Sequence, residues 1–520
     1  MSGMLGAEAV LRTLVAGGVD TCFMNPGTSE MRLVAALDEV RDIRGVLALF
    51  EGVATGAADG YARMAGRAAA VLLHLGPGLG NGLANLHNAR KAFSPVVAVV
   101  GDHATYHKQY DTQLESDIET VAQNVSPWIT RVERSDSIGR AVAEAVTAAS
   151  GPPGQVATLI VPADLSWSEG AEASGTSGGA VNPAPEQATI RAAAAALRRG
   201  GASAILIGGA ACRADELRLA ESIALCAGAA LFCETFPARL QRGAGMPSVT
   251  RLAYLGEVAA TQLEGLRDLV LIGAKAPASF FAYPDKPSLL APDGCQLHPL
   301  VKPGFPARDA LEALAGELGA PKWKAGEDPP RPVLRHGELS LAALSAAIGA
   351  LLPEGAIVSD ESNTSGLGLG GATAGAPPHD WLTLTGGAIG QGLPVACGAA
   401  IACPGRKVVA LQADGSALYT FQALWTMARE ELDVVVVLYN NRSYGILNME
   451  LQRTGASAGG TRARRMLDLS DPDLDFVALS AGLGVPAQRV ATSEEFAAAF
   501  ARALSTPGPA LIEAVVPSLV

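Results

Sequence analysis

Charged and aromatic side chains are scarce in this sequence. Of the 520 residues, 17% are charged and 5% are aromatic, whereas 49% are hydrophobic. The formal net charge is −12, and no basic run is longer than Arg462–Arg465. Proteins that bind nucleic acid concentrate Lys and Arg on one face, so no nucleic-acid partner is expected. No uncharged apolar stretch reaches the roughly 18 residues of a membrane span, so no membrane partner is expected either.

Cysteine is sparse as well. The seven cysteines form no C-x-x-C pair, and most of them lie in apolar runs. This pattern indicates reduced core residues rather than metal ligands. The segment Met1–Val19 is amphipathic and lacks the continuous apolar stretch of a signal peptide. We therefore expect a cytoplasmic protein.

Short apolar runs recur along the chain with Ala-rich helical patterns between them. Runs that are apolar on both faces are typical of parallel strands covered by helices on each side. The sequence therefore predicts the α/β class. The predicted strands are Ala69–His74, Pro95–Val100, Gln155–Val161, Ala204–Ile207, Asp268–Ile272, Ala356–Val358, Lys407–Leu411, Asp433–Leu438 and Ala510–Val515.

Two changes in composition divide the chain. Glu169–Pro185 is rich in Gly, Ser, Ala and Pro, and Ala320–Val333 is rich in Pro, Lys and Glu, as is typical of linkers. They leave the segments 1–168, 186–320 and 336–520. We expect each segment to be a doubly wound domain with its own parallel sheet.

The third segment carries the most specific pattern. The predicted strand Lys407–Leu411 is followed closely by Asp414-Gly415-Ser416, and Asp433–Leu438 leads to Asn440-Asn441. Both polar groups therefore lie at the carboxyl ends of neighbouring strands, where open α/β sheets bind ligands. Carboxylate, amide and carbonyl oxygens suit Mg²⁺, and a helix opening at Gly415 would direct its amides at an anion. Each motif alone is an ordinary turn, but the pair at this spacing predicts a metal–phosphate site.

This pattern resembles the signature of thiamine-diphosphate enzymes, which is Gly-Asp-Gly followed some thirty residues later by Asn-Asn. Ala413 stands where the family has its first glycine. The resemblance implies that Asp414, Asn441 and the Ser443 carbonyl hold Mg²⁺. It also implies a set of residues that contact thiamine diphosphate here: Asp414, Gly415, Ser416, Asn441, Ser443, Tyr444 and Gly445.

Further motifs extend the resemblance over nearly the whole chain. Asn25-Pro26-Gly27-Thr28, the helix after Glu51, His74–Gly78 and Gly386–Pro394 look like the decarboxylase and acetolactate synthase branch, which includes benzoylformate decarboxylase. That resemblance implies pyrimidine-binding, central and diphosphate-binding domains, in this order.

The resemblance also implies roles for four residues. Glu51, at the end of an expected apolar strand over Ala48–Phe50, would bond to the aminopyrimidine and activate the cofactor. An ion pair with Arg63 or a neighbour is the alternative. Ile389 would hold the cofactor in its bent shape. Asp360–Thr364 would lie near the diphosphate or pyrimidine, with Asn363 and Thr364 as the preferred contacts, or would only cap a helix.

Three histidines are candidates for substrate chemistry. His74 stands where benzoylformate decarboxylase has an active-site histidine, and Thr28 replaces its substrate-binding serine. The second active-site histidine of that enzyme has no counterpart in Ala278–Tyr283. His103 and His107 follow another predicted strand, and their roles stay open. The glycine-rich stretch Gly76–Gly82 is interpreted as a loop that approaches the cofactor.

The function implied is attack of the cofactor ylid on a 2-oxo acid, decarboxylation, and release of an aldehyde or carboligation to a hydroxyketone or acetohydroxyacid. FAD binding is allowed by the resemblance, but the strand-end turn at Ile207–Ala210 does not indicate it. The family implies a homodimer or homotetramer with active sites between subunits. The alternatives are a non-catalytic cofactor-binding homologue and a nucleotide-dependent oxidoreductase. Retention of Glu51, Asp414 and Asn441 argues against the first, because a silent homologue has no need of an activating carboxylate.

Overall fold

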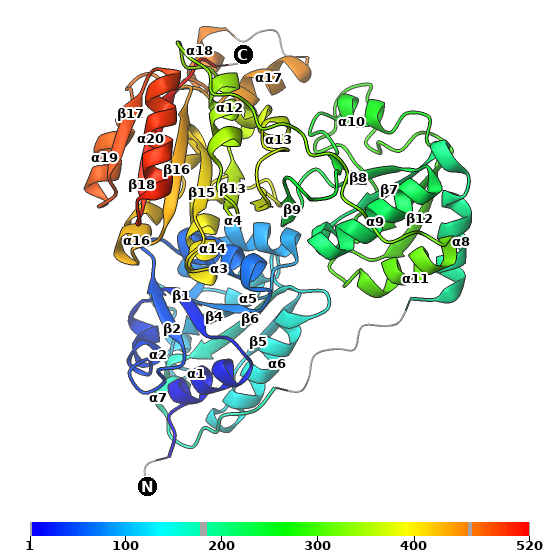
Figure 1. Cartoon of the computed structure of the whole chain (residues 1–520). Helices are drawn as coiled ribbons and strands as arrows, with labels where there is room; N and C mark the ends of the chain where they lie inside the picture. Colours follow the sequence, from blue (N-terminus) through cyan, green and yellow to red (C-terminus); the bar gives the residue numbers. More distant parts are fainter. Residues whose placement is uncertain (1–2, 177–184, 456–459, 519–520) are drawn as a thin grey trace.

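Three α/β units make up the chain, each built on a largely or wholly parallel sheet (Figure 1). The computed structural model describes residues 3–176, 185–455 and 460–518. Each of the nine strands predicted between Ala69 and Val515 is found, with ends that differ by a few residues, so the α/β class is confirmed. The apolar run Ala48–Phe50 lies outside any strand. Among the described residues, no helix is long and apolar enough to span a membrane.

The first unit has a six-stranded parallel sheet with the order β2-β1-β3-β4-β6-β5. Helices α3 and α4 pack on one face, and α1 and α6 pack on the other. The strands are β1 (Thr21–Asn25), β2 (Arg44–Leu47), β3 (Ala69–Leu73), β4 (Val96–Asp102), β5 (Trp128–Arg131) and β6 (Val156–Pro162). The helices are α1 (Gly6–Ala16), α2 (Met31–Ala35), α3 (Glu51–Ala65), α4 (Leu75–Ala92), α5 (Ile118–Ala122), α6 (Ile138–Ser150) and α7 (Ala163–Trp167).

The second unit has a five-stranded parallel sheet with the order β10-β8-β7-β11-β12. Its strands are β7 (Ser203–Ile207), β8 (Ala230–Cys233), β10 (Thr250–Arg251), β11 (Asp268–Ile272) and β12 (Gln296–Val301). Its helices are α8 (Gln187–Leu197), α9 (Ala214–Ala227), α10 (Gly256–Gln262) and α11 (Arg308–Leu318).

The third unit has a seven-stranded sheet with the order β17-β18-β16-β15-β13-β14-β9. Strand β9 (Leu240–Arg242) comes from the segment predicted to be central, and it pairs antiparallel to β14 at the sheet edge. The other strands are β13 (Ile357–Glu361), β14 (His379–Leu382), β15 (Val408–Ala413), β16 (Val434–Asn440), β17 (Ala487–Val490) and β18 (Ala510–Val515). The helices are α12 (Leu341–Leu351), α13 (Leu369–Ala372), α14 (Gly392–Ala402), α15 (Asp414–Ala417), α16 (Ala423–Arg429), α17 (Gly445–Arg453), α18 (Thr461–Arg465), α19 (Phe476–Gly482) and α20 (Ser493–Ser505).

The glycine-rich stretch Gly76–Gly82 is helical, so its interpretation as a loop is wrong. It forms the first turns of α4, where its glycines permit close packing. A Cβ on Gly76 would lie 2.1 Å from Ser116 Oγ, and one on Gly82 would lie 2.8 Å from Thr55 Cγ2. Tertiary contacts therefore outweigh the low helix propensity of glycine here.

Helices α3 and α14 join the first and third units (Figure 1). A Cβ on Gly398 of α14 would lie 1.8 Å from the Ala57 carbonyl oxygen of α3. In turn, a Cβ on Gly60 would lie 2.2 Å from the Val395 carbonyl oxygen. The two helices thus touch backbone to backbone, and one apolar core continues across them from one sheet to the other.

Adding a methyl group at this contact is expected to destabilise the protein. Gly398→Ala should lower stability by roughly 1–3 kcal/mol, because the new Cβ meets rigid backbone. Gly316→Ala is the matched control, since that helical glycine of α11 has open space around it. Urea unfolding of both variants checks this, and equal midpoints for the two would contradict it.

Candidate active site

Asp414 and Asn441 meet at the carboxyl ends of two paired strands. Strands β15 and β16 are parallel neighbours, Asp414 follows the first, and Asn441 follows the second. The amide of Arg442 donates to Asp414 Oδ2 at 2.6 Å, and the amide of Gly415 donates to Oδ1 at 2.8 Å. The structure therefore brings together the two motifs that the sequence places one strand–helix–strand unit apart.

Burial makes the Asp414 carboxylate a favourable cation ligand. The residue is 2% exposed, and burial raises the pKa of its carboxyl group to about 6, although backbone amides at Gly415, Arg442 and Asn441 oppose the rise. A divalent cation would compensate this desolvated charge. Asn441, at the end of the neighbouring strand, offers an amide oxygen, so the donor chemistry of the two side chains fits Mg²⁺.

The loop after β16 packs against the residues that follow β15. Asn441 Oδ1 accepts a hydrogen bond from the Ser443 amide at 3.0 Å. The Tyr444 ring lies against Gly415, where a Cβ would be 2.5 Å from Tyr444 Cε1. A Cβ on Gly445 would lie 3.6 Å from Asn441 Nδ2. These predicted cofactor residues therefore form one compact group.

Thr364 joins this group and Asn363 lies at its edge. Both belong to the 3₁₀ helix η6 (Asn363–Gly366), which follows β13. Thr364 Oγ1 lies 3.2 Å from the place of a Cβ on Gly445. Asn363 is exposed and has a left-handed φ of 51°, and it makes no helix-capping bond, because the N-cap position is Ser362.

Glu361 is a functional candidate that the sequence did not single out from its neighbours. It is the last residue of β13 and is 2% exposed. Its two carboxylate oxygens accept hydrogen bonds from the amides of Gly390 and Gly392, each at 2.6 Å. Burial raises the pKa of the Glu361 carboxyl group to about 7, against these hydrogen bonds and one from Gln412. Its position at a strand end was the signal that could have identified it.

The loop that carries Ile389 is held from both units. From α4, Asn88 Nδ2 donates to the Ala388 carbonyl oxygen at 2.8 Å, and Asn85 Nδ2 donates to the Gly390 carbonyl oxygen at 3.2 Å. From the third unit, Glu361 binds the amides described above. Ile389 is therefore presented by a loop whose backbone is fixed on either side of it.

Glu51 is the first residue of α3 and is 7% exposed. The expected strand ends earlier, at Leu47, because Ala48–Phe50 turn the chain into the helix. Asn81 Nδ2 donates to Glu51 Oε2 at 3.0 Å. The alternative ion pair is wrong, since Arg63 instead binds Asp59 within a buried pair.

His74 and Thr28 lie close to each other through a shared turn. His74 is the N-cap residue of α4, and its Nδ1 is 2.7 Å from Glu30 Oε2. The same Glu30 oxygen accepts a hydrogen bond from the Gly27 amide at 2.8 Å. Gly27 directly precedes Thr28, which is exposed.

His103 and His107 lie beyond β4, with ring centroids 5.4 Å apart. His103 Nε2 is 3.4 Å from Thr112 Oγ1.

The candidate residues form two groups in the chain. One group contains Thr28, Glu51 and His74 in the first unit, and the other surrounds Asp414 and Asn441 in the third. Within the ranges that the structure describes, no hydrogen bond or ion pair directly joins the first group to Asp414, Asn441 or Ser443.

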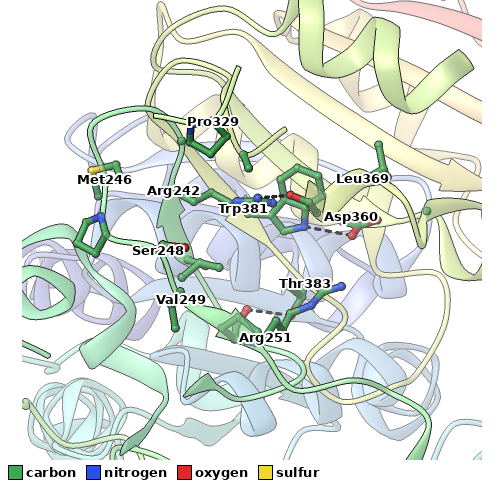
Figure 2. A pocket seen from close by; sticks show the side chains of 17 residues that line it. Arg242, Met246, Ser248, Val249, Arg251, Pro329, Asp360, Leu369, Trp381 and Thr383 are labelled. Carbon is green, nitrogen blue, oxygen red and sulfur yellow. Dashed lines mark hydrogen bonds between the residues drawn. The ribbon is translucent and has the colours of Figure 1, made fainter. Parts of the chain in front are cut away.

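A cavity of about 250 Å³ lies beside the third sheet, between β14 and the β9 segment (Figure 2). Arg242 lies over the Trp381 ring, and Trp381 Nε1 donates to Asp360 Oδ2 at 3.1 Å. None of the predicted cofactor residues lines this cavity. The Trp381 bond fixes Asp360, the neighbour of Glu361.

Comparison with known proteins adds independent information. Residues 4–123 match the family model described as thiamine pyrophosphate enzyme, N-terminal TPP binding domain. Residues 370–514 match the corresponding C-terminal TPP binding domain. The chain is 57% identical over 518 residues to IlvX of Mycobacterium tuberculosis, which carries the provisional name of an acetolactate synthase large subunit; the match covers 99% of this chain and 100% of that one.

Two decarboxylases are also similar over almost their full length. Benzoylformate decarboxylase of Pseudomonas aeruginosa is 30% identical over 531 residues, covering 95% of this chain and 96% of that enzyme. Among solved structures, the thiamine diphosphate-dependent 4-hydroxybenzoylformate decarboxylase of Rhodococcus jostii RHA1 has a TM-score of 0.86 at 26% identity and covers 99% of both chains.

Removing the Glu361 carboxylate is expected to change how stability depends on pH. Because its pKa rises from 4.5 to about 7 on folding, the folded state keeps a proton that the unfolded state releases. The stabilisation is complete below pH 4.5 and is lost as pH rises to about 7, by on the order of 3 kcal/mol.

In the cofactor-free protein, the free energy of unfolding should therefore fall less between pH 5 and pH 8 in Glu361→Gln than in the wild type. Urea unfolding at the two pH values measures this difference. The exposed Glu354, before β13, offers the control Glu354→Gln, which should leave the fall unchanged. If Glu361→Gln lost as much unfolding free energy between pH 5 and pH 8 as the wild type, burial of the charged Glu361 carboxylate would not be destabilising.

Proposed function

Because the chain belongs to the thiamine-diphosphate-dependent enzymes of the acetolactate synthase and benzoylformate decarboxylase kind, we propose that it decarboxylates a 2-oxo acid with the help of Mg²⁺. The remaining fragment is released as an aldehyde or joined to a second carbonyl compound. The observation that carries the proposal is the joint presence of a buried Glu51 and a buried Asp414 beside Asn441. A non-catalytic homologue would have no need of both.

The group around Asp414 would hold the metal and the diphosphate. Asp414, the Asn441 side chain and the Ser443 carbonyl offer oxygen ligands for Mg²⁺. Helix α15 consists of Asp414, Gly415, Ser416 and Ala417. By itself this helix is too short to account for anion binding. The remaining contacts that we propose are Asn363, Thr364, Ile389, Tyr444 and Gly445.

Glu51 would act on the pyrimidine end of the cofactor. Its Oε2 already accepts from Asn81, which leaves Oε1 as the acceptor or donor for a ring nitrogen. Gly78 gives this oxygen room, since a Cβ there would lie only 3.3 Å from it. When bound, thiamine diphosphate supplies a nucleophilic carbon and an electron sink for the decarboxylation. Glu51 holds the proton that this activation requires.

Thr28 and His74 would bind the substrate. The exposed Thr28 hydroxyl can donate to the carboxylate of a 2-oxo acid, and the half-buried His74 can hold or release a proton nearby. His74 lies on the Glu51 side of the site: a Cβ on Gly78 would lie 3.3 Å from both His74 Cβ and Glu51 Oε1. This proximity supports a shared role in one reaction.

We further propose a homodimer or homotetramer in which each site combines two chains. Within the described ranges, no hydrogen bond or ion pair joins Thr28, Glu51 or His74 to the Asp414 group. Exposed large apolar side chains lie near both sets of residues. Those near the first group are Met31 and Leu49, and those near the second are Leu418, Tyr419 and Leu447. Apolar side chains exposed in this way are typical of subunit interfaces.

Replacing the activating carboxylate should abolish most turnover while cofactor binding persists. Glu51→Gln is expected to lower CO₂ release from 2-oxo acids by roughly 100-fold or more, because the amide cannot hold the proton. Calorimetric titration should still show thiamine diphosphate binding in the presence of Mg²⁺. The exposed Glu39 provides the control Glu39→Gln, which should retain full turnover. Full turnover in Glu51→Gln would refute the proposed function.

A further inference from the structure

Glu30 is a buried carboxylate whose only side-chain partner is the imidazole of His74 among the residues that the structure describes. It is the last residue of the 3₁₀ helix η1 (Thr28–Glu30) and is 0% exposed. Its Oε2 lies 2.7 Å from His74 Nδ1 and also accepts the Gly27 amide at 2.8 Å. Its Oε1 is buried and has no hydrogen-bond partner.

The backbone on both sides fixes this pair in place. A Cβ on Gly101 of β4 would lie 1.7 Å from Glu30 Oε1, so the carboxylate has little freedom to rotate. A Cβ on Gly27 would lie 2.3 Å from His74 Cγ, so the imidazole face rests on this glycine. Gly27 and Gly101 thus stand at positions where any side chain would displace the Glu30–His74 pair.

The contact determines which imidazole nitrogen is available. A carboxylate can only accept, so His74 Nδ1 must carry a hydrogen. The other nitrogen, Nε2, is then free to exchange a proton with a substrate. The His74 side chain is 21% exposed while that of Glu30 is 0% exposed, so only the histidine can reach a ligand.

The energetics argue against a purely structural ion pair. A buried carboxylate with one unpartnered oxygen is costly, and such groups concentrate at functional sites. Burial raises the pKa of the Glu30 carboxyl group, while the charge of His74 and the Gly27 amide lower it.

Two other carboxylates lie on the elements packed around the pair. Glu51 is on α3. Asp102, at the end of β4, is already bound by Lys108 and Arg131.

We propose that Glu30 is a positioning residue that sets the tautomer of His74 and stabilises its protonated form, so that Nε2 donates a proton to the reacting substrate. In this step the Nε2–H bond of the imidazolium breaks, the substrate gains the proton, and a neutral imidazole remains with Nδ1–H bonded to Glu30. Solvent returns the proton at the exposed edge of the ring. The proposal rests on the proposed function for its substrate, but the pair itself is a property of the free protein.

Two variants separate the charge from the hydrogen bond. Glu30→Gln keeps an acceptor for Nδ1–H but removes the charge, whereas Glu30→Leu removes both. The chain has seven histidines, so the ring signals of ¹⁵N-histidine-labelled, cofactor-free protein can be assigned with His74→Gln. We expect the Nδ1–H tautomer of His74 in the wild type and in Glu30→Gln, and its loss in Glu30→Leu. The His74 titration should move to lower pH in Glu30→Gln.

The activity readout is the pH profile of kcat/KM for CO₂ release. In Glu30→Gln, the side of the profile where kcat/KM falls as His74 loses its proton should move to lower pH. The maximum value of kcat/KM should fall by at least roughly tenfold. A His74 titration that is the same in Glu30→Gln and wild type would overturn the proposal, as would a uniformly scaled pH profile. If no 2-oxo acid releases CO₂ but the titration moves as expected, the proposed function fails and the Glu30–His74 pairing stands.

Discussion

Backbone contact between α3 and α14 is the constraint on which the rest of the structure depends. Because glycines at positions 60 and 398 face carbonyl oxygens of the opposite helix, the two helices approach more closely than side chains would allow. This contact fixes the first unit on the third and lets α4 reach the Ile389 loop with Asn85 and Asn88. It also determines where Glu51 stands, since that residue opens α3. The position of Glu51, the carboxylate proposed to activate the cofactor, is thus set by helix packing some distance from it.

Buried carboxylates concentrate at the strand ends that this packing brings into place. Glu30, Glu361 and Asp414 are all at most 2% exposed, and burial raises the pKa of each carboxyl group. Each is held by backbone amides, so the charges are oriented before any ligand binds. Such preorganisation costs folding free energy and is typical of sites that act on charged groups.

Most of the fold could be predicted from the sequence, because strands buried on both faces appear as continuous apolar runs. The meeting of Asp414 and Asn441 could be predicted for a related reason, because each of them closely follows such a run. The glycine-rich start of α4 was predicted wrongly, since its helix depends on contacts with Ser116 and Thr55 rather than on local propensity. Glu30 could not be identified, because its role depends on an imidazole and a backbone amide that come close only in the folded chain. Glu361 follows a predicted strand, but the amides that bind its carboxylate also come close only in the folded chain.

The central claim is that the Glu51 group of one chain and the Asp414 group of another complete a single site. Subunit mixing tests this most directly with two inactive variants, Glu51→Gln and Asp414→Asn, which are unfolded, combined and refolded together. If sites form between chains, a mixed dimer contains one site with both residues intact, so CO₂ release should recover to about a quarter of the wild-type value at equal mixing. If the two groups act within one chain, the mixture should stay as inactive as either variant alone.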